Sequence, residues 1–191
     1  MSAEGNARLT AATAAVLLVL LAAEGATIPF VGQVTTLHIF LGVLLVPVVL
    51  LKAGSSAWRF ASYYFGREDY VSRGAPPPLL RLLVAPLVVA STAVLFGTGI
   101  LLIVPSPQRG AVLGLHQASF LVWFAAMTAH VLAHVLRVPG LVREDLRPGQ
   151  RGATTRQLLV AGAVVAGLVT AVALLPEAHG WSHWALTHGD G

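Results

Sequence analysis

The chain has 191 residues, of which 56% are hydrophobic and only 10% are charged, and its mean hydropathy is +0.78. Soluble domains carry about 25% charged residues, so this composition excludes a water-soluble fold and indicates an integral membrane protein. The absence of cysteine excludes disulfides, iron–sulfur clusters, thiolate haem ligands and cysteine nucleophiles. The net charge of +4 does not indicate a nucleic-acid partner, because the basic residues follow the loops expected at a membrane.

Five apolar stretches are long enough to cross a bilayer, which takes about 20 residues of helix. They cover residues 9–31, 35–57, 79–104, 112–138 and 157–175. We therefore predict an all-α fold: a single domain over residues 1–191 that forms a membrane bundle of five transmembrane helices. Pro47 and Pro86 lie inside the second and third spans, where each should kink or loosen its helix.

Arginine is distributed unevenly between the loops, and this predicts the orientation of the chain. Arg8 precedes the first span, and two groups of arginines flank or lie within the loops after spans two and four: Arg59, Arg67, Arg73 and Arg81, then Arg137, Arg143, Arg147, Arg151 and Arg156. The two opposite loops contain only Arg109. The positive-inside rule then predicts a multi-pass protein of the inner (plasma) membrane, with a cytoplasmic N-terminus and the C-terminus outside. Spans two and four run parallel in this topology.

Ionisable side chains at membrane depth are costly and are functional candidates for that reason. The second span carries His38 and Lys52, and the fourth carries His116 and His130, so both intervals are 14 residues. Fourteen residues return to within about 40° of the same helix face and rise about 21 Å along the axis. Parallel helices with equal intervals can therefore oppose His38 to His116 near the outside and Lys52 to His130 near the inside.

Haem iron takes two axial ligands on opposite sides of its ring, and neutral imidazole is a common one. The two intervals therefore predict two b-type haems between spans two and four, with spans one to four forming the haem-binding core. A flat macrocycle needs small residues at its edge, and Gly97 and Gly99 of the third span lie near the level of the outer pair. His134, one turn below His130, is an alternative ligand at the inner site.

These residues resemble the cytochrome b superfamily, in which each of two helices carries two histidines with 13 residues between them. His116-x13-His130 reproduces one such helix, and His38-x13-Lys52 reproduces the other with lysine as the fourth ligand. Residues 37–42 (LHIFLG) and 97–99 (GTG) also look like segments of small bacterial di-haem (b561-like) cytochromes. The resemblance covers residues 1–138. It implies transmembrane electron transfer through two haem b groups, in an oxidoreductase linked to quinone or superoxide or in the electron-transfer subunit of one.

Lys52 has two interpretations. An amine binds iron only when it is neutral, and the apolar core disfavours the ammonium form, so Lys52 and His130 could ligate the inner haem. Alternatively, Lys52 stays charged and reaches the inner interface or a haem propionate, because the span ends little more than one turn later. The sequence leaves both open.

A second class of function remains open beside electron transfer. A non-redox transporter or assembly subunit would use the intramembrane histidines, Lys52 and Glu24 as a proton or metal path. The C-terminal tail carries His179, His183 and His188 with Trp181 and Trp184. We interpret this tail as a short amphipathic segment on the outer surface rather than a metal site. The expected partners are membrane lipid and either quinone or a redox protein.

Overall fold

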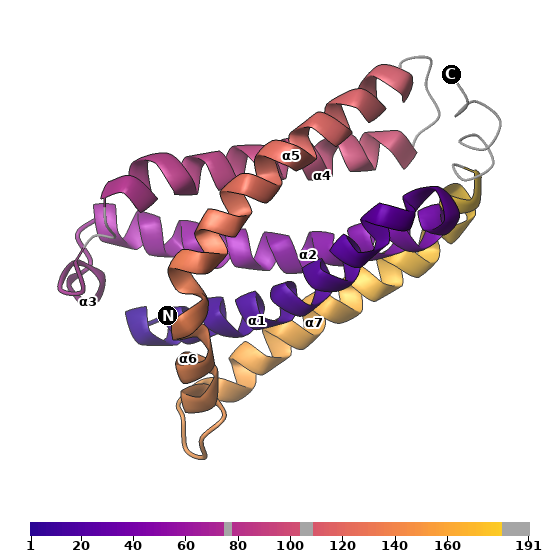
Figure 1. The fold of residues 1–191 in the computed structure, drawn as a ribbon. Helices are drawn as coiled ribbons and strands as arrows, with labels where there is room; N and C mark the ends of the chain where they lie inside the picture. The colour runs from indigo at the N-terminus through magenta and orange to yellow at the C-terminus, as the bar shows by residue number, and fades with distance from the viewer. Residues whose placement is uncertain (75–77, 104–108, 181–191) are drawn as a thin grey trace.

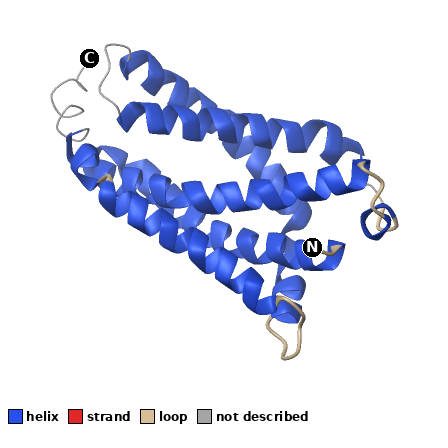
Figure 2. Ribbon diagram, turned by 180° about the vertical axis from the view of Figure 1, so that it is seen from behind, coloured by secondary structure: helices blue, strands red, loops and turns tan. Residues whose placement is uncertain are grey.

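The computed structural model describes residues 1–74, 78–103 and 109–180, and every regular element in them is a helix (Figures 1 and 2). The long helices are α1 (Ala3–Thr27), α2 (Val31–Tyr64), α4 (Ala85–Ile103), α5 (Arg109–His134) and α7 (Ala153–Ala173). The short ones are η1 (Ile28–Phe30), α3 (Glu68–Val71), η2 (Leu80–Val84), η3 (Val135–Arg137) and α6 (Val138–Asp145). The predicted all-α fold class is confirmed.

Four helical stretches of the described chain are apolar and long enough to cross a membrane: Ala3–Tyr64, Leu80–Ile103, Arg109–Asp145 and Ala153–Ala173. The first has 62 residues and contains two helices, α1 and α2. The turn η1 folds these two helices back against each other (Figure 1). The chain therefore has the helices of a multi-pass membrane protein.

The helices extend beyond several of the predicted spans, as α1 and α2 do. α1 begins at Ala3 because the hydroxyl of Ser2 caps it, accepting a hydrogen bond from the backbone N–H of Gly5 at 3.2 Å. The predicted fourth span, 112–138, is interrupted: α5 ends at His134 and α6 begins at Val138, with a proline in its first turn. Proline suits that position because the first turn uses no N–H there.

The two interior prolines behave differently. Pro86 follows the π-helical turn η2, so the backbone is loosened there as predicted. In α2 the residue with non-helical dihedral angles is Val34, whereas Pro47 lies within continuous helix. The neighbouring Leu45 and Val48 are fully buried against Leu17 of α1, so this part of α2 packs closely on α1.

The long helices form two layers. α1, α2 and α7 pack on one another as one layer, and α4 and α5 pack as a pair that forms the other (Figures 1 and 2). Gly167 allows α7 to approach α2, because a Cβ atom at this position would lie against the carbonyl oxygen of Leu44. The first layer is therefore closely packed through its middle.

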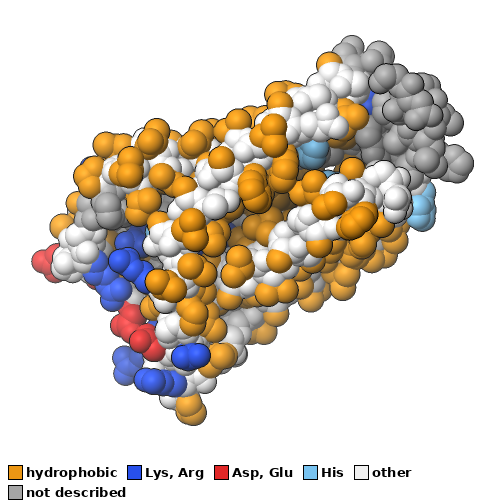
Figure 3. All heavy atoms as spheres, in the orientation of Figure 1, with side chains coloured by type: hydrophobic (Ala, Val, Ile, Leu, Met, Phe, Trp, Pro, Cys, Tyr) orange, Lys and Arg blue, Asp and Glu red, His pale blue; other side chains and the backbone are white. Residues whose placement is uncertain are grey.

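Charged side chains gather at one end of the bundle, where the N-terminus, α3 and the connection from α6 to α7 lie (Figures 1 and 3). Arg109 begins α5 at the opposite end. The two ends therefore differ in charge in the way that the arginine pattern predicts.

Candidate functional site

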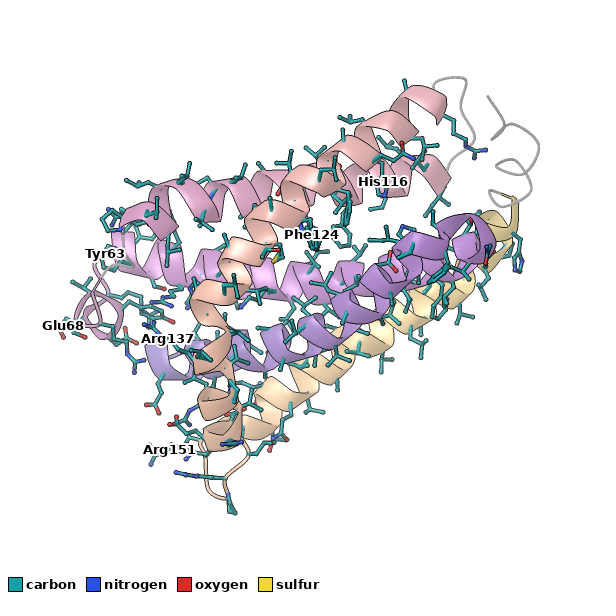
Figure 4. All side chains as sticks on the ribbon, viewed as in Figure 1. Tyr63, Glu68, His116, Phe124, Arg137 and Arg151 are labelled. Atoms are coloured by element: carbon teal, nitrogen blue, oxygen red, sulfur yellow. The ribbon has the colours of Figure 1, made fainter. Side chains whose placement is uncertain are left out.

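A cavity of about 1050 Å³ lies between the two layers and is lined by α1, α2, α4 and α5. Cofactor and ligand pockets typically measure about 300–1,000 Å³, so this cavity is large enough for a cofactor. Most of its lining is apolar, and His38 of α2 and His116 of α5 are among its few polar side chains. Figure 4 shows His116 and Phe124, two turns apart on α5, beside the space between the layers.

The structure brings the predicted outer pair together. The ring centroids of His38 and His116 are 6.5 Å apart, and their planes are nearly perpendicular at 85°. A metal–imidazole bond is about 2 Å long and a ring nitrogen lies about 1 Å from the ring centre, so two imidazoles on opposite sides of one ion have centroids about 6 Å apart. The separation of the two rings therefore suits one metal ion between them.

The surroundings of His38 assign its tautomer. Its Nδ1 lies 2.8 Å from Oγ1 of Thr27 and 3.0 Å from Oε1 of Glu24, both on α1. The hydroxyl of Thr27 donates its hydrogen to the carbonyl oxygen of Glu24 at 2.6 Å, so toward His38 it accepts. Nδ1 of His38 therefore carries the proton, and Nε2 keeps its lone pair.

His116 is held in the same way by α4. Its Nδ1 lies 3.1 Å from the carbonyl oxygen of Leu95 and 3.1 Å from Oγ1 of Thr98. Thr98 donates its own hydrogen to the carbonyl oxygen of Val94 at 2.7 Å, so both neighbours of this nitrogen accept. Metal-binding histidines characteristically donate their second N–H to such groups, which aims the other nitrogen at the metal. Within the described residues, Nε2 of neither histidine has a hydrogen-bond partner.

The two predicted glycines have different surroundings. A Cβ atom at Gly99 would lie 3.3 Å from Cε1 of His116, so the absence of a side chain lets the imidazole lie against α4. Gly99 also lines the cavity. Gly97 does not line it, and a Cβ atom there would meet no atom within 4 Å. The structure therefore places Gly99 at the site and Gly97 away from it.

The inner residues do not face each other across the cavity, and each is held by other contacts. Nζ of Lys52 donates to the carbonyl oxygen of Thr10 on α1 at 3.0 Å. His130 stacks on His134 with centroids 4.7 Å apart, and Nδ1 of His134 donates to the carbonyl oxygen of His130 at 2.9 Å. Neither Lys52 nor His130 lines the cavity.

Sequence reasoning missed the residues that orient the histidines. It identified Glu24 only as a relay group, and it did not identify Thr27 or Thr98. A usable signal for Thr27 is its place one turn after Glu24 on the same helix, beside the reversal that brings α1 against α2. The carbonyl of Leu95 has no sequence signal, because every residue carries one.

Of the C-terminal tail, the structure describes the chain as far as residue 180. His179 is exposed after the end of α7, whereas Trp181, His183, Trp184 and His188 lie outside the described residues. No group of three or more His, Cys, Asp or Glu residues in the described part of the chain could hold a metal ion.

Comparisons with protein-family models, with curated proteins and with solved structures find no match to this chain. The geometry of the cavity and of its two histidines therefore carries the functional interpretation.

Proposed function

We propose that this protein is a b-type cytochrome of the membrane, with His38 and His116 as the axial ligands of an outer haem. The observation that carries the proposal is the pair of imidazoles 6.5 Å apart at one cavity, each with Nδ1 held by the protein. A porphyrin provides four nitrogen ligands itself, so two protein ligands are enough. A structural Zn²⁺ ion takes four ligands, typically all from the protein.

A haem bound here would supply one-electron redox chemistry. The residues of the chain would orient the ligands and keep water away. Glu24 and Thr27 hold the ring of His38, while Leu95 and Thr98 hold that of His116. The apolar lining lowers the local dielectric constant, and together with the ligands it would tune the reduction potential of a bound haem.

The proposal includes five membrane crossings, by α1, α2, α4 with η2, α5 and α7, with the arginine-rich end in the cytoplasm. Its support is the length of these helices and the gathering of charge at one end. Such a chain would be a membrane cytochrome of the type that its histidine spacing resembles. Quinone, superoxide or a redox protein would exchange electrons with it.

A second, inner haem between Lys52 and His130 stays part of the proposal. Its support is the shared interval of 14 residues on two helices that run in the same direction (Figure 1). Lys52 would have to leave the carbonyl oxygen of Thr10 to reach iron, or His134 would replace it. The outer site is therefore the stronger half of the proposal.

The packing of the first layer favours electron transfer over a proton path. Leu17, Leu45 and Val48 form a buried apolar cluster between the level of His38 and that of Lys52. Protons need relay groups at hydrogen-bonding distances, and these three side chains offer none. Electrons cross such an apolar gap without relay groups.

The test is an optical spectrum and a pyridine haemochrome assay of the purified full-length chain. We expect a Soret band and a fixed ratio of haem to protein. His38→Ala and His116→Ala should each abolish the outer haem, whereas Gln117→Ala, which changes a neighbouring residue of the cavity lining, should retain it. A wild-type protein without haem, or His variants with unchanged haem content, would refute the proposal.

A further inference from the structure

A second cavity, of about 310 Å³, lies at the arginine-rich end of the bundle. Its walls come from the first turns of α1, from the connection between α6 and α7, and from the start of α7. The lining residues are Ser2, Glu4, Gly5, Arg8, Gly149, Gln150, Arg151 and Arg156. Three guanidinium groups therefore meet one carboxylate around a space that is separate from the histidine site.

Two of the arginines are buried and held in place by the protein. Arg156 is 6% exposed, forms an ion pair with Asp145, and donates from Nη1 to the carbonyl oxygen of Arg151 at 3.1 Å. Arg8 is 9% exposed and donates to side-chain oxygens of Glu4 and Gln150. Both guanidinium planes are thus oriented before any ligand arrives, which lowers the entropic cost of binding.

Arg8 also has a donor that the protein does not use. Its Nε is buried and has no hydrogen-bond partner. A buried, unsatisfied donor on a charged group is costly, and this one belongs to a side chain that lines the cavity. The nearby carboxylate of Glu144 lies 3.9 Å from Nη2 of Arg8 and leaves Nε unpaired.

Arg151 completes the site from the outside. It is exposed at the charged end of the bundle (Figure 4). Gly149 and Gly152, with φ of +82° and +71°, turn the backbone on either side of Arg151 through a conformation that favours glycine. The connection therefore presents Arg151 beside the two buried arginines.

We propose that this cavity binds a phosphate group, that of an anionic phospholipid headgroup at the membrane surface. Guanidinium groups match phosphate oxygens in geometry and charge, and arginine is favoured where phosphate is recognised for this reason. Basic pockets between transmembrane helices are a known way to hold anionic headgroups. Glu4, Glu144 and Asp145 balance the formal charge of the three arginines, so the attraction for phosphate comes from oriented guanidinium donors around a defined space and not from a net positive charge. This inference does not depend on the haem.

The experiment compares two exposed arginines of the same connection in the full-length protein. Arg151→Gln removes a residue of the cavity lining, and Arg147→Gln removes an equal charge that does not line it. Native mass spectrometry measures retained phosphatidylglycerol against phosphatidylcholine, and a thermal-shift titration with inorganic phosphate tests the free ion. Arg8→Gln serves as a second cavity variant.

We expect the wild type and Arg147→Gln to retain phosphatidylglycerol over phosphatidylcholine, and Arg151→Gln to bind it about fivefold more weakly. Stabilisation by inorganic phosphate that Arg151→Gln abolishes, without lipid retention, would support the phosphate site and assign it to a free anion. Equal loss in Arg147→Gln and Arg151→Gln, or no loss in Arg151→Gln and Arg8→Gln, would overturn the proposal.

Discussion

The outer pair, His38 with His116, and the inner pair, Lys52 with His130, have the same spacing in the sequence but different surroundings in the structure. The outer rings lie 6.5 Å apart at a cavity, each oriented by groups from a neighbouring helix. At the inner level, Lys52 is held by α1 and His130 stacks on its own neighbour, His134. Equal intervals along two helices therefore give equal heights but do not guarantee equal partners.

The path of α5 explains the difference. α5 runs obliquely across the first layer from its start at Arg109 and continues through η3 into α6, which packs on α1 (Figure 1). His116, near the start of α5, thus lies beside His38 of α2, whereas α6, which continues the path of α5, packs on α1. A strict helical period predicts opposition along the whole length only for helices that stay aligned.

The largest expected effect is the complete loss of one haem component while the other is retained. If both haems bind, a redox titration of the wild type shows two components, and His130→Ala should leave only the outer one. Lys52→Met should likewise change the inner component alone, because Lys52 would be the opposite ligand. An unchanged spectrum in Lys52→Met would instead assign Lys52 to its hydrogen bond with Thr10.

A change in the packing of α2 should damage both sites together. Gly167→Ala places a methyl group against the carbonyl oxygen of Leu44, and overpacking of this kind costs about 1–3 kcal/mol. We expect a lower unfolding temperature and parallel loss of both haem components. Gly162→Ala, where a Cβ atom meets nothing within 4 Å, is the matched control and should behave as the wild type. Loss confined to one component would contradict the shared role of α2.

A change at Gly99 should affect the outer site alone and more mildly. In Gly99→Ala the new methyl group lies 3.3 Å from the ring of His116, so the imidazole must shift by a few tenths of an ångström. We expect a shifted outer spectrum and an unaltered inner one, read by low-temperature absorbance. Gly97→Ala has open space and should leave both spectra unchanged. An equal response to the two substitutions would show that Gly99 has no special contact.

The smallest effect should come from the hydroxyl groups that orient the rings. Thr98→Val removes one of two acceptors at Nδ1 of His116, and a single such hydrogen bond is worth about 0.5–1.5 kcal/mol. We expect a two- to tenfold loss of outer haem affinity in a competition assay with apomyoglobin. Thr128→Val, on α5 beside the same cavity but hydrogen-bonded only to its own helix, should show no loss. Equal affinities for the two variants would contradict the role of Thr98.

Much of the fold follows from the sequence, because the bilayer directly constrains the length of the apolar stretches and the distribution of arginine between the loops. The outer histidines were predictable since their spacing is a one-dimensional property of two helices. The contact of Glu24 with His38 was not predictable, because it depends on the sharp reversal at η1. The contact of Lys52 with Thr10 depends on how closely α1 packs on α2. Neither the apolar stretches nor the 14-residue intervals indicate that distance.

The reversal at η1 also bears on the order in which the protein assembles. Glu24, Thr27 and His38 all lie within the first two long helices, so the contacts among them are local and form quickly. During synthesis these helices emerge before α5, and with them one complete half of the outer site. His116 then joins a ring whose orientation is already set, so the chain gains the capacity to bind a ligand between the two rings only when its fourth long helix arrives.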